Sequence, residues 1–471
     1  MSEKAQERPK ALIIGAGLSG MLLAILFERQ GISYKIFEKT LDMKPLGSCM
    51  AFNANILPVL DQLGLLEETK KISLQGDRFD SYSSDLKFLG SIRFGHCNEN
   101  IGYPTLMFTR YEMHNLLKSK IPKERFVLGK KMTSYSQDDD GVEVFFEDDS
   151  SYKGEILIGA DGAYSSVRKS MYKQIEPLGL LPKKDIKDMK AAYITMVGVS
   201  KPLDPEKYPI LKSPISTTDQ MMGGSSGYSW TTVTVTDNRV SWGVVLQLET
   251  TDIQEARATC EWGEEGIRSM TNDVKDFKTT FGATLGEFIE QTPIETISKV
   301  FLEEKMFETW YHNRVVLIGD ACHKFLPSVG QGAMNAMQDS VVLANTLFDI
   351  EDYTTKNIVA AFKDYRQQRY NYAQYEIGKS TLMGRLSYGQ GWIDRILRHI
   401  VFNFVPQFIF TRQVLSDTAY RPQATFLPRA PKRGTVSIAP QKPSKRYLGP
   451  NEIETSRSKR FRSKKEMPVA L

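Results

Sequence analysis

Residues that form disulfides or bind metals are scarce in this 471-residue chain. It has only five histidines and four cysteines. Neither metal-type pairing nor a tight disulfide framework is evident among Cys49, Cys97, Cys260 and Cys322, which favours a reducing, cytoplasmic setting. We therefore predict no metal site and no disulfide scaffold.

The chain also lacks a long uncharged apolar run. In the most hydrophobic late segment, residues 391–410, the uncharged part is too short to span a bilayer, and Asp394, Arg395 and Arg398 interrupt it. This segment predicts either a core helix or a helix lying in a membrane interface, basic on one side and aromatic on the other. The first ten residues are polar and charged, so we expect no signal peptide.

No charge imbalance demands a nucleic acid partner. The 61 basic and 56 acidic residues leave a formal net charge of +5. From Tyr420 onward Pro, Lys, Arg and Ser dominate, which predicts a disordered basic tail over residues 421–471. Binding to anionic lipid, as a peripheral contact on an intracellular membrane, and nuclear import are alternatives for this tail.

Three separated Gly-rich segments are present, and each suits a dinucleotide. The first is a turn from Gly15 to Gly20 that follows an apolar strand and opens a helical pattern. Gly15 permits the tight turn, Gly17 lets a pyrophosphate approach the backbone, and Gly20 lets helix and strand pack closely. Glu38 ends the next strand, where it accepts from ribose hydroxyls and repels a 2′-phosphate, which argues against NADP at this site.

The second segment lies in mid-chain and repeats the order of strand, turn and helix. An apolar strand ends at Asp161 and Gly162, and Arg168 follows one turn into the next helix. The alternative is an ordinary turn whose helix is capped by Ser165 or Ser166.

The third segment has the most specific pattern. The apolar run 315–318 leads to Asp320, a proline turn and two glycines at a helix start. Backbone amides at a helix N-terminus favour negative charge, and glycine lets a ligand approach them closely. We expect Asp320 to accept from a polyol hydroxyl, and the amides near Gly332 and Ala333 to face an electron-rich ring edge.

In this order and at these intervals, the segments resemble FAD-dependent monooxygenases of the para-hydroxybenzoate hydroxylase type (group A), over residues 10–380. The short substrate region and aromatic C-terminal part are more similar to fungal enzymes that epoxidise or hydroxylate terpenoid, meroterpenoid and prenylated compounds. Kynurenine and salicylate hydroxylases are not excluded. The resemblance implies FAD contacts at Gly15, Gly17, Gly20, Glu38, Ala51, Arg110, Asp320, Gly332 and Ala333.

Two of these positions have a second interpretation or differ from the family pattern. Ala51 stands where many family members have glycine, so the backbone contact to the flavin differs there by one methyl group. Arg110 precedes the apolar positions of a helix, and a surface cation is the other interpretation of it. The sequence has no second three-glycine motif that could hold a nicotinamide dinucleotide. The resemblance implies that NADH or NADPH binds only transiently, and that Asp161 and Arg168 take part in this encounter.

The expected fold class is α/β, with a Rossmann-like FAD-binding domain, an inserted mixed β-sheet substrate domain and a C-terminal helical region. We expect the FAD-binding domain to comprise residues 10–75, 100–185 and 295–380, and the substrate domain to comprise residues 76–99 and 186–294. The C-terminal helical region is expected at residues 381–420 and the tail at residues 421–471. Strands are predicted over 191–199, 228–236 and 240–248, the last two joined as a hairpin at Asp237 and Asn238. Helices are predicted over 333–349 and 358–379.

Three aromatic residues of the substrate sheet have two interpretations. Tyr228, Trp230 and Trp242 either line a substrate pocket or pack in a core, and packing is favoured for the tryptophans. For Tyr228 the resemblance implies a catalytic role in oxygen transfer, whereas a one-residue slip of the strand would bury the ring instead.

The resemblance also implies the reaction. Reduced FAD and O₂ form a C4a-hydroperoxide, which hydroxylates or epoxidises a lipophilic terpenoid or prenylated aromatic substrate. NAD(P)H supplies the electrons. Two alternatives stay open, a flavin-dependent isoprenoid reductase or oxidase on the same fold, and a non-catalytic prenyl-binding protein on a related one.

Overall fold

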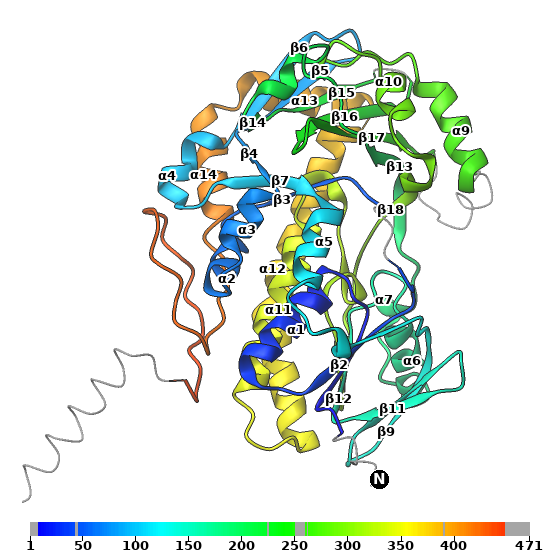
Figure 1. Ribbon diagram of the computed structural model, residues 1–471, viewed down its shortest axis with the longest axis vertical. Helices are drawn as coiled ribbons and strands as arrows, with labels where there is room; N and C mark the ends of the chain where they lie inside the picture. The colour runs from blue at the N-terminus through cyan, green and yellow to red at the C-terminus, as the bar shows by residue number, and fades with distance from the viewer. Residues whose placement is uncertain are drawn as a thin grey trace, which may run out of the picture.

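The computed structural model describes residues 8–42, 46–223, 226–249, 260, 262–389 and 391–447. Two lobes follow one another along the long axis, and a long helix connects them (Figure 1). The α/β class predicted from the sequence is confirmed.

The lower lobe in Figure 1 contains a six-stranded sheet of order β19-β20-β12-β1-β2-β8. Its strands are β1 Ala11–Ile14, β2 Tyr34–Glu38, β8 Phe126–Leu128, β12 Ile156–Gly159, β19 Tyr311–His312 and β20 Val315–Leu317. All pairs except β19 with β20 are parallel. The neighbouring strands β1, β12 and β20 each lead into one Gly-rich segment, so all three segments leave the same edge of the sheet.

Helices cover this sheet, and a small antiparallel sheet extends it. The longer helices are α1 Leu18–Gln30, α5 Arg110–Lys118, α6 Ser166–Ile175 and α11 Gly332–Phe348, and the small sheet is β9 Met132–Gln137, β10 Val142–Phe146 and β11 Ser151–Gly154. Contacts join α1 to α11 and α6 to β9. Strands β1, β12 and β20 are fully buried, as expected for a parallel sheet covered on both faces.

A four-stranded sheet lies between the lobes, in the order β14-β4-β7-β3. Its strands are β3 Cys49–Phe52, β4 Leu74–Gly76, β7 Thr105–Thr109 and β14 Ile215–Ser216. Among the described residues, the short helices are α2 Leu57–Gln62, α3 Leu66–Lys71, α4 Asn98–Ile101, α7 Lys183–Ile186 and α10 Leu285–Glu290. The 3₁₀ turns are η1 Gly95–Cys97, η2 Lys123–Arg125, η3 Pro209–Lys212, η4 Ile294–Thr296, η5 Gly319–Ala321 and η6 Pro327–Val329.

The upper lobe is an eight-stranded sheet of order β21-β18-β13-β17-β16-β15-β5-β6. Its strands are β5 Arg78–Ser83, β6 Phe88–Arg93, β13 Lys190–Val199, β15 Thr218–Met222, β16 Tyr228–Val235, β17 Arg239–Gln247, β18 Ser298–Met306 and β21 His323–Lys324. The predicted hairpin is confirmed, because Asp237 and Asn238 both have positive φ, as a type I′ turn requires. The predicted domain boundary at residue 295 falls too early, since β18 pairs with β13 in this sheet.

The two faces of this sheet differ. A core that includes Trp230, Trp242, Phe288 and Val274 lies on the outer face, against α10 and α9 Gly263–Val274. The predicted packing role of the two tryptophans is confirmed, since Trp230 and Trp242 are buried there. The opposite face is called the inner face here and is turned toward helix α12 Thr355–Tyr388.

Helix α12 is longer than the predicted 358–379. It contacts α11 in the lower lobe and β15, β16 and β17 in the upper lobe. Helices α13 Trp392–Phe404 and α14 Gln407–Asp417 follow it. Among the described residues, no helix combines the length and apolarity that crossing a bilayer requires.

Residues 421–447 contain no helix or strand but pack on the folded chain, with Ala424 and Phe426 buried. Side-chain amides hold their backbone, since Gln62 Nε2 donates to the carbonyl of Ala424 (3.1 Å) and Asn345 Nδ2 to that of Gln423 (2.8 Å). The prediction of a disordered tail was therefore wrong for this part, because polar composition does not reveal such partners. Residues 448–471 lie outside the described residues.

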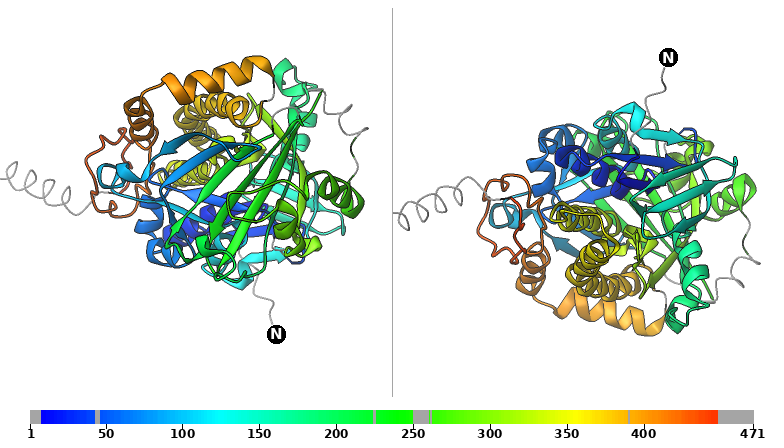
Figure 2. Two further views of the ribbon diagram at one scale, coloured as in Figure 1. Left: turned by 90° about the horizontal axis from the view of Figure 1, so that it is seen from above. Right: turned by 90° about the horizontal axis from the view of Figure 1, so that it is seen from below.

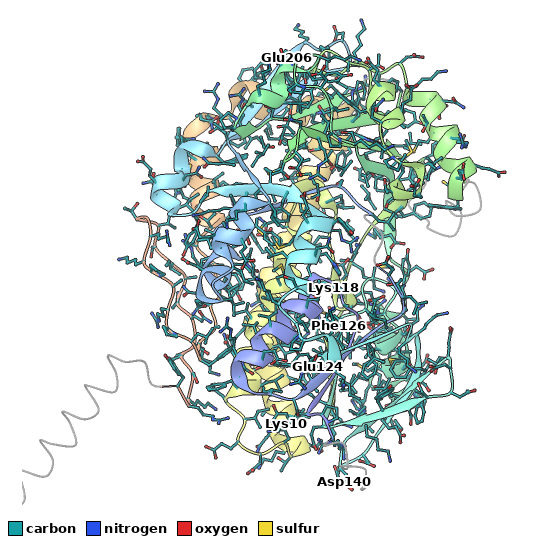
Figure 3. All side chains as sticks on the ribbon, viewed as in Figure 1. Lys10, Lys118, Glu124, Phe126, Asp140 and Glu206 are labelled. Atoms are coloured by element: carbon teal, nitrogen blue, oxygen red, sulfur yellow. The ribbon has the colours of Figure 1, made fainter. Side chains whose placement is uncertain are left out.

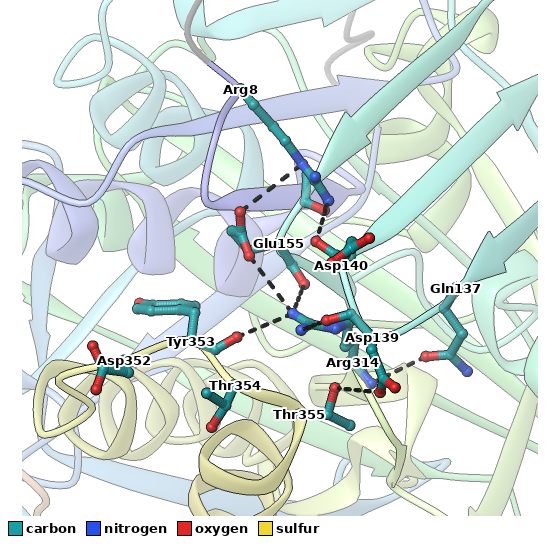
Figure 4. Close-up of polar contacts among 12 residues, drawn as sticks. Arg8, Gln137, Asp139, Asp140, Glu155, Arg314, Asp352, Tyr353, Thr354 and Thr355 are labelled. Carbon is teal, nitrogen blue, oxygen red and sulfur yellow. Dashed lines mark hydrogen bonds and ion pairs between the residues drawn. The ribbon is translucent and has the colours of Figure 1, made fainter.

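A buried arginine secures the end of the lower lobe that is farthest from the upper sheet. Arg314 donates to the carbonyls of Asp138 (3.0 Å), Glu155 (3.1 Å) and Tyr353 (3.2 Å), as Figure 4 shows in part. An open pocket beside it is lined by Lys10 and other polar residues, none of them a predicted cofactor ligand. Figure 3 places Lys10 at this end and Glu206 at the opposite one.

A fully buried carboxylate, Asp339 of α11, connects three parts of the lower lobe. Its oxygens accept from the Gly319 amide (2.8 Å) and Arg369 Nε (2.7 Å), and lie 2.6 Å from His323 Nε2. Burial alone would raise the pKa of this carboxyl, but the charges of His323 and Arg369 outweigh it and hold the pKa below its usual value. The network fixes the Gly319 turn against α11 and α12.

We expect Asp339→Asn to lower the free energy of unfolding by about 3–5 kcal/mol, because it leaves the Arg369 charge buried without its carboxylate. Asp364→Asn is the control, since Asp364 pairs with Lys442 near the surface and its loss should cost about 1 kcal/mol or less. Urea denaturation measures both. Equal stability losses in the two variants would contradict the role given to Asp339.

Candidate functional site

The turn after β1 requires glycine at two of its three positions. A Cβ on Gly15, which has φ +104°, would lie 2.4 Å from the carbonyl oxygen of Ala160, and a Cβ on Gly20 would lie 2.2 Å from that of Gly15. Gly17 differs, because a Cβ added there would have no atom within 4 Å. Gly17 is the N-cap of α1, and no side chain among the described residues accepts a hydrogen bond from the first amides of this helix. The helix start is therefore open to an anionic ligand.

Glu38 lies directly beside this turn. Its Oε2 accepts from the Ala16 amide (3.0 Å), and its Oε1 accepts from the amide (3.0 Å) and hydroxyl of Thr40. The carboxylate is thus held at the end of β2, next to the glycine turn. This is the position at which a ribose hydroxyl is bound in dinucleotide sites.

His114 is a neighbour that sequence reasoning missed. It is buried on α5, and its Nε2 lies 3.0 Å from the Ala16 carbonyl oxygen. Burial lowers its pKa and the charge of Arg110 adds to this effect, so the ring is neutral at pH 7 and donates from Nε2. Its sequence context offers no signal, because the contact spans 98 residues.

Arg110 starts α5, whose first turn is fixed by a capping box between Thr109 and Glu112. The side chain is exposed and lies against Gly47, where an added Cβ would be 3.2 Å from Arg110 Cδ. Ala51 is on β3, partly exposed and paired with Met107 of β7. Both residues are therefore in the layer between the lobes, at the border of the nucleotide domain.

Asp320 follows β20 in η5 and has a cationic partner. Lys324 Nζ lies 2.6 Å from Asp320 Oδ2, and this carboxylate raises the pKa of Lys324, while Arg110 acts in the opposite direction. Arg110, Lys324 and Asp320 are thus close enough to interact electrostatically. Sequence reasoning missed Lys324, although its spacing of four residues from Asp320 is visible.

A second open helix start lies next to Asp320. Gln331 is the N-cap of α11 without a side-chain cap, and no atom lies within 4 Å of a Cβ on Gly332. Ala333 is partly buried at the next position. A Cβ on Gly319 would lie 2.8 Å from Ala336 Cβ and 3.3 Å from Ser19 Oγ, so the starts of α1 and α11 approach each other here.

Asp161 and Arg168 hold the segments together. Asp161 Oδ2 accepts from the amides of Ser166 (2.6 Å) and Val167 (3.2 Å), and Ser165 caps α6, as the alternative interpretation of this segment expected. The buried Arg168 donates to the carbonyls of Ala321 (2.7 Å) and Ala163 (2.6 Å). A contact of either residue with a nicotinamide stays a prediction.

Tyr228 is not brought to these residues. It packs with Phe277 and the outer-face core, and its hydroxyl donates to Asp273 Oδ2 on α9 (2.8 Å). In β16 it points to the same side as the buried Trp230, two residues further on. The geometry therefore supports the alternative interpretation of the sequence, in which a one-residue shift of the strand turns the Tyr228 ring into the core.

The residues present fit a flavin dinucleotide. Two open helix starts suit its phosphates and its electron-rich ring, and Glu38 and Asp320 suit ribose and ribityl hydroxyls. The glycines that cannot carry a Cβ lie between these groups, in segments from three parts of the chain.

Comparison with known proteins agrees with this geometry. A family model described as an FAD binding domain matches residues 8–375. An FAD-dependent monooxygenase of Aspergillus flavus, atmM, is 28% identical over 412 residues, covering 84% of this chain and 82% of its own. The FAD-dependent monooxygenase ptmM of Penicillium ochrochloron is 30% identical over 371 residues, covering 76% and 84%.

A solved structure shares the fold. Klebsiella pneumoniae HpxO, complexed with FAD and uric acid, superposes with a TM-score of 0.72 at 20% identity, covering 88% of this chain and 98% of its own. At this identity the likeness extends to the fold alone.

We expect Glu38→Ala to weaken FAD binding about 10- to 100-fold, because a charge-assisted hydrogen bond to ribose contributes about 1.5–3 kcal/mol. Titration of the flavin-free protein with FAD measures it, and excess FAD should restore full occupancy. Glu28→Ala is a control carboxylate, since Glu28 pairs with Arg125 away from the glycine turn. Unchanged affinity in Glu38→Ala would remove Glu38 from the site.

We expect Tyr228→Phe to leave flavin content, turnover and coupling unchanged, because its hydroxyl bonds Asp273 on the outer face. The loss of this bond to a carboxylate should lower stability by about 1.5–3 kcal/mol at most. Product and hydrogen peroxide are measured together. Slower product formation with increased peroxide would restore the catalytic role.

Proposed function

Because this chain belongs to the FAD-dependent monooxygenases of the para-hydroxybenzoate hydroxylase type, we propose that it hydroxylates or epoxidises a lipophilic terpenoid or prenylated aromatic compound, with NAD(P)H as electron donor. The enzyme class follows from the family. The substrate class rests on a pocket at the inner face of the upper sheet.

This pocket is lined almost entirely by apolar side chains. It lies between the inner face, the end of α12, and helices α13 and α14, and its lining includes Phe79, Ile92, Met222, Met383, Val401 and Phe402. Such a lining offers little to a charged or strongly polar substrate and much to a hydrocarbon framework. The pocket has a volume of only about 20 Å³ in this structure, so a terpenoid or prenyl group would enter it only if α13 and α14 shift, and the support for such an occupant is the chemistry of the walls.

Two buried polar atoms in this region have no partner. Ser81 Oγ on β5 and Gln220 Oε1 on β15 are unbonded, and both residues are about 1% exposed. They are register neighbours in paired strands, so their side chains point to the same face. Burying such atoms without a partner is costly, and a substrate hydroxyl or amide that donates to Gln220 Oε1 would remove this cost.

Helix α12 connects the pocket to the Asp320 segment. Ser380 Oγ of α12 donates to the carbonyl of Leu326 (2.9 Å), and Ser328 Oγ donates to that of Ser380 (2.7 Å). Met383 and Ser387 of the same helix line the pocket one to two turns further on. Helix α12 thus connects the pocket wall to the segment before α11, and we propose that a substrate in the pocket reaches a ring bound at that helix start.

The chemistry that FAD supplies when bound is two-electron transfer from a nicotinamide and activation of O₂. The protein's contribution is to exclude water and to orient the substrate. The inner face and α12 would close the reaction space, while Gln220 and Ser81 would fix the direction of the substrate.

We expect the purified protein to oxidise NAD(P)H only when a suitable substrate is added, and to incorporate one atom of ¹⁸O₂ into the product. The assay uses a panel of prenylated aromatics and terpenoids, each with and without a free hydroxyl group, and mass spectrometry of the products. A site built to pair a polar group rejects analogues that lack it, so we expect the hydroxylated members to react.

Gln220→Leu is the matched variant, because it removes the unbonded Oε1 and keeps the size of the side chain. It also removes the hydrogen bond that Gln220 Nε2 donates to the carbonyl of Ser387 (2.8 Å), so its stability is measured as well. It should raise KM for hydroxylated members more than for the others. Turnover without incorporation of ¹⁸O would instead indicate a reductase or oxidase, and oxidation of polar, non-prenylated substrates alone would contradict the substrate class.

A further inference from the structure

An exposed apolar surface covers the outer side of α13 and the start of α14, called the α13–α14 surface here. Its large hydrophobic side chains are 46–72% exposed. They are Trp392, Ile393, Ile396, Ile400, Phe404, Phe408 and Ile409. Single exposed hydrophobic residues are ordinary, whereas seven on two consecutive helices mark a contact surface.

The helical period explains the surface. In α13 the positions 392, 396, 400 and 404 recur every four residues and face outward, while Val401 and Phe402 are half-buried and line the apolar pocket. The helix is therefore apolar on both its inner and outer sides. Packing against β6 explains the inner side alone, because the ring of Phe402 lies against Gly90.

The exposed charges on these helices are positive. The acidic residues of α13 and α14 are Asp394 and Asp417, which are half-buried and paired, Asp394 with Arg385 (2.8 Å) and Asp417 with Lys379 (2.5 Å). Arg395, Arg412 and His399 are exposed beside the hydrophobic residues. An apolar strip with cations and no exposed acid matches the interface of a membrane that carries anionic lipid.

The rest of the described chain leaves this surface uncovered. Figure 2 shows α13, in orange, along the rim of the molecule in both views. The segment 421–447 turns away from it and packs beside α2 and α11, where Gln62 and Asn345 hold it. The surface is thus available to a flat partner.

We propose that the α13–α14 surface docks the protein on an anionic lipid bilayer, with α13 lying in the interface plane. Its hydrophobic side chains enter the boundary of headgroups and acyl chains, and Arg395 and Arg412 contact lipid phosphates. The same helix lines the apolar pocket with its other side, so docking places that pocket beside the phase in which lipophilic compounds dissolve. The inference rests on the α13–α14 surface and does not depend on which substrate the pocket binds.

The test is co-sedimentation of the full-length, FAD-loaded protein with vesicles of phosphatidylcholine containing about 30% phosphatidylserine, compared with phosphatidylcholine alone. The triple variant Trp392→Ser, Phe404→Ser, Phe408→Ser keeps every charge and should bind at least about tenfold more weakly. The matched control is Leu178→Ser, Leu180→Ser, Ile186→Ser, which removes three hydrophobic residues of the lower lobe that are 58–63% exposed, and it should bind as the unchanged protein does.

Keeping every charge in the triple variant matters, because the basic run at residues 457–465 adds positive charge that would attract anionic lipid independently of α13. Trp392 gives a second readout, since Trp230, Trp242 and Trp310 are buried and Trp262, which is 39% exposed, packs against Phe301 of β18. Its emission should shift to the blue when anionic vesicles are added, and Trp392→Phe should abolish most of this shift.

Binding to anionic vesicles that is equal in the triple variant and the unchanged protein would overturn the proposal, as would the absence of vesicle binding. A concentration-dependent dimer in sedimentation velocity that the triple variant abolishes, without vesicle binding, would assign the surface to a second copy instead. Bound flavin and ¹⁸O incorporation are measured separately in every variant, so a failure of docking is distinguishable from a failure of the proposed reaction.

Discussion

The Asp339 carboxylate sets the position of everything that the third Gly-rich segment contributes. It accepts from the Gly319 amide, contacts His323 and pairs with Arg369 of α12, all without exposure to solvent. A buried ion pair is seldom more stable than apolar packing of the same volume, so its main consequence is geometric. Because Gly319 precedes Asp320, the network fixes that carboxylate relative to the start of α11 and to the helix that reaches the upper lobe.

The parts of the site that could be predicted are those with local causes. Gly15 and Gly20 are required by close backbone contacts, and the strand and helix on either side of their turn have clear apolar patterns. The acid at the end of the second strand follows from the same local geometry. His114 and Arg369 could not be found in this way, because their partners are 98 and 30 residues away and depend on how the helices pack.

Tyr228 and the segment 421–447 illustrate two other limits. A strand pattern gives alternation but does not say which face meets the nucleotide domain, and α9 and α10 decide that for Tyr228 and Trp230. Composition identifies residues 421–447 as polar and proline-rich, yet Gln62 and Asn345 supply hydrogen bonds that hold this backbone in place. Both outcomes depend on tertiary partners that no local window of sequence contains.

The two faces of the upper sheet pack against different elements, and this difference determines where the C-terminal helices lie. The outer face is closed by its own core of tryptophan and phenylalanine side chains, so it needs no further partner. The inner face keeps Ser81 and Gln220 with unbonded atoms, and α12, α13 and α14 complete its apolar wall. A helix that forms a wall of this kind exposes its opposite side unless another layer covers it. In the part of the chain that the structure describes, no such layer covers α13, and hydrophobic residues on that side are what an interfacial helix requires.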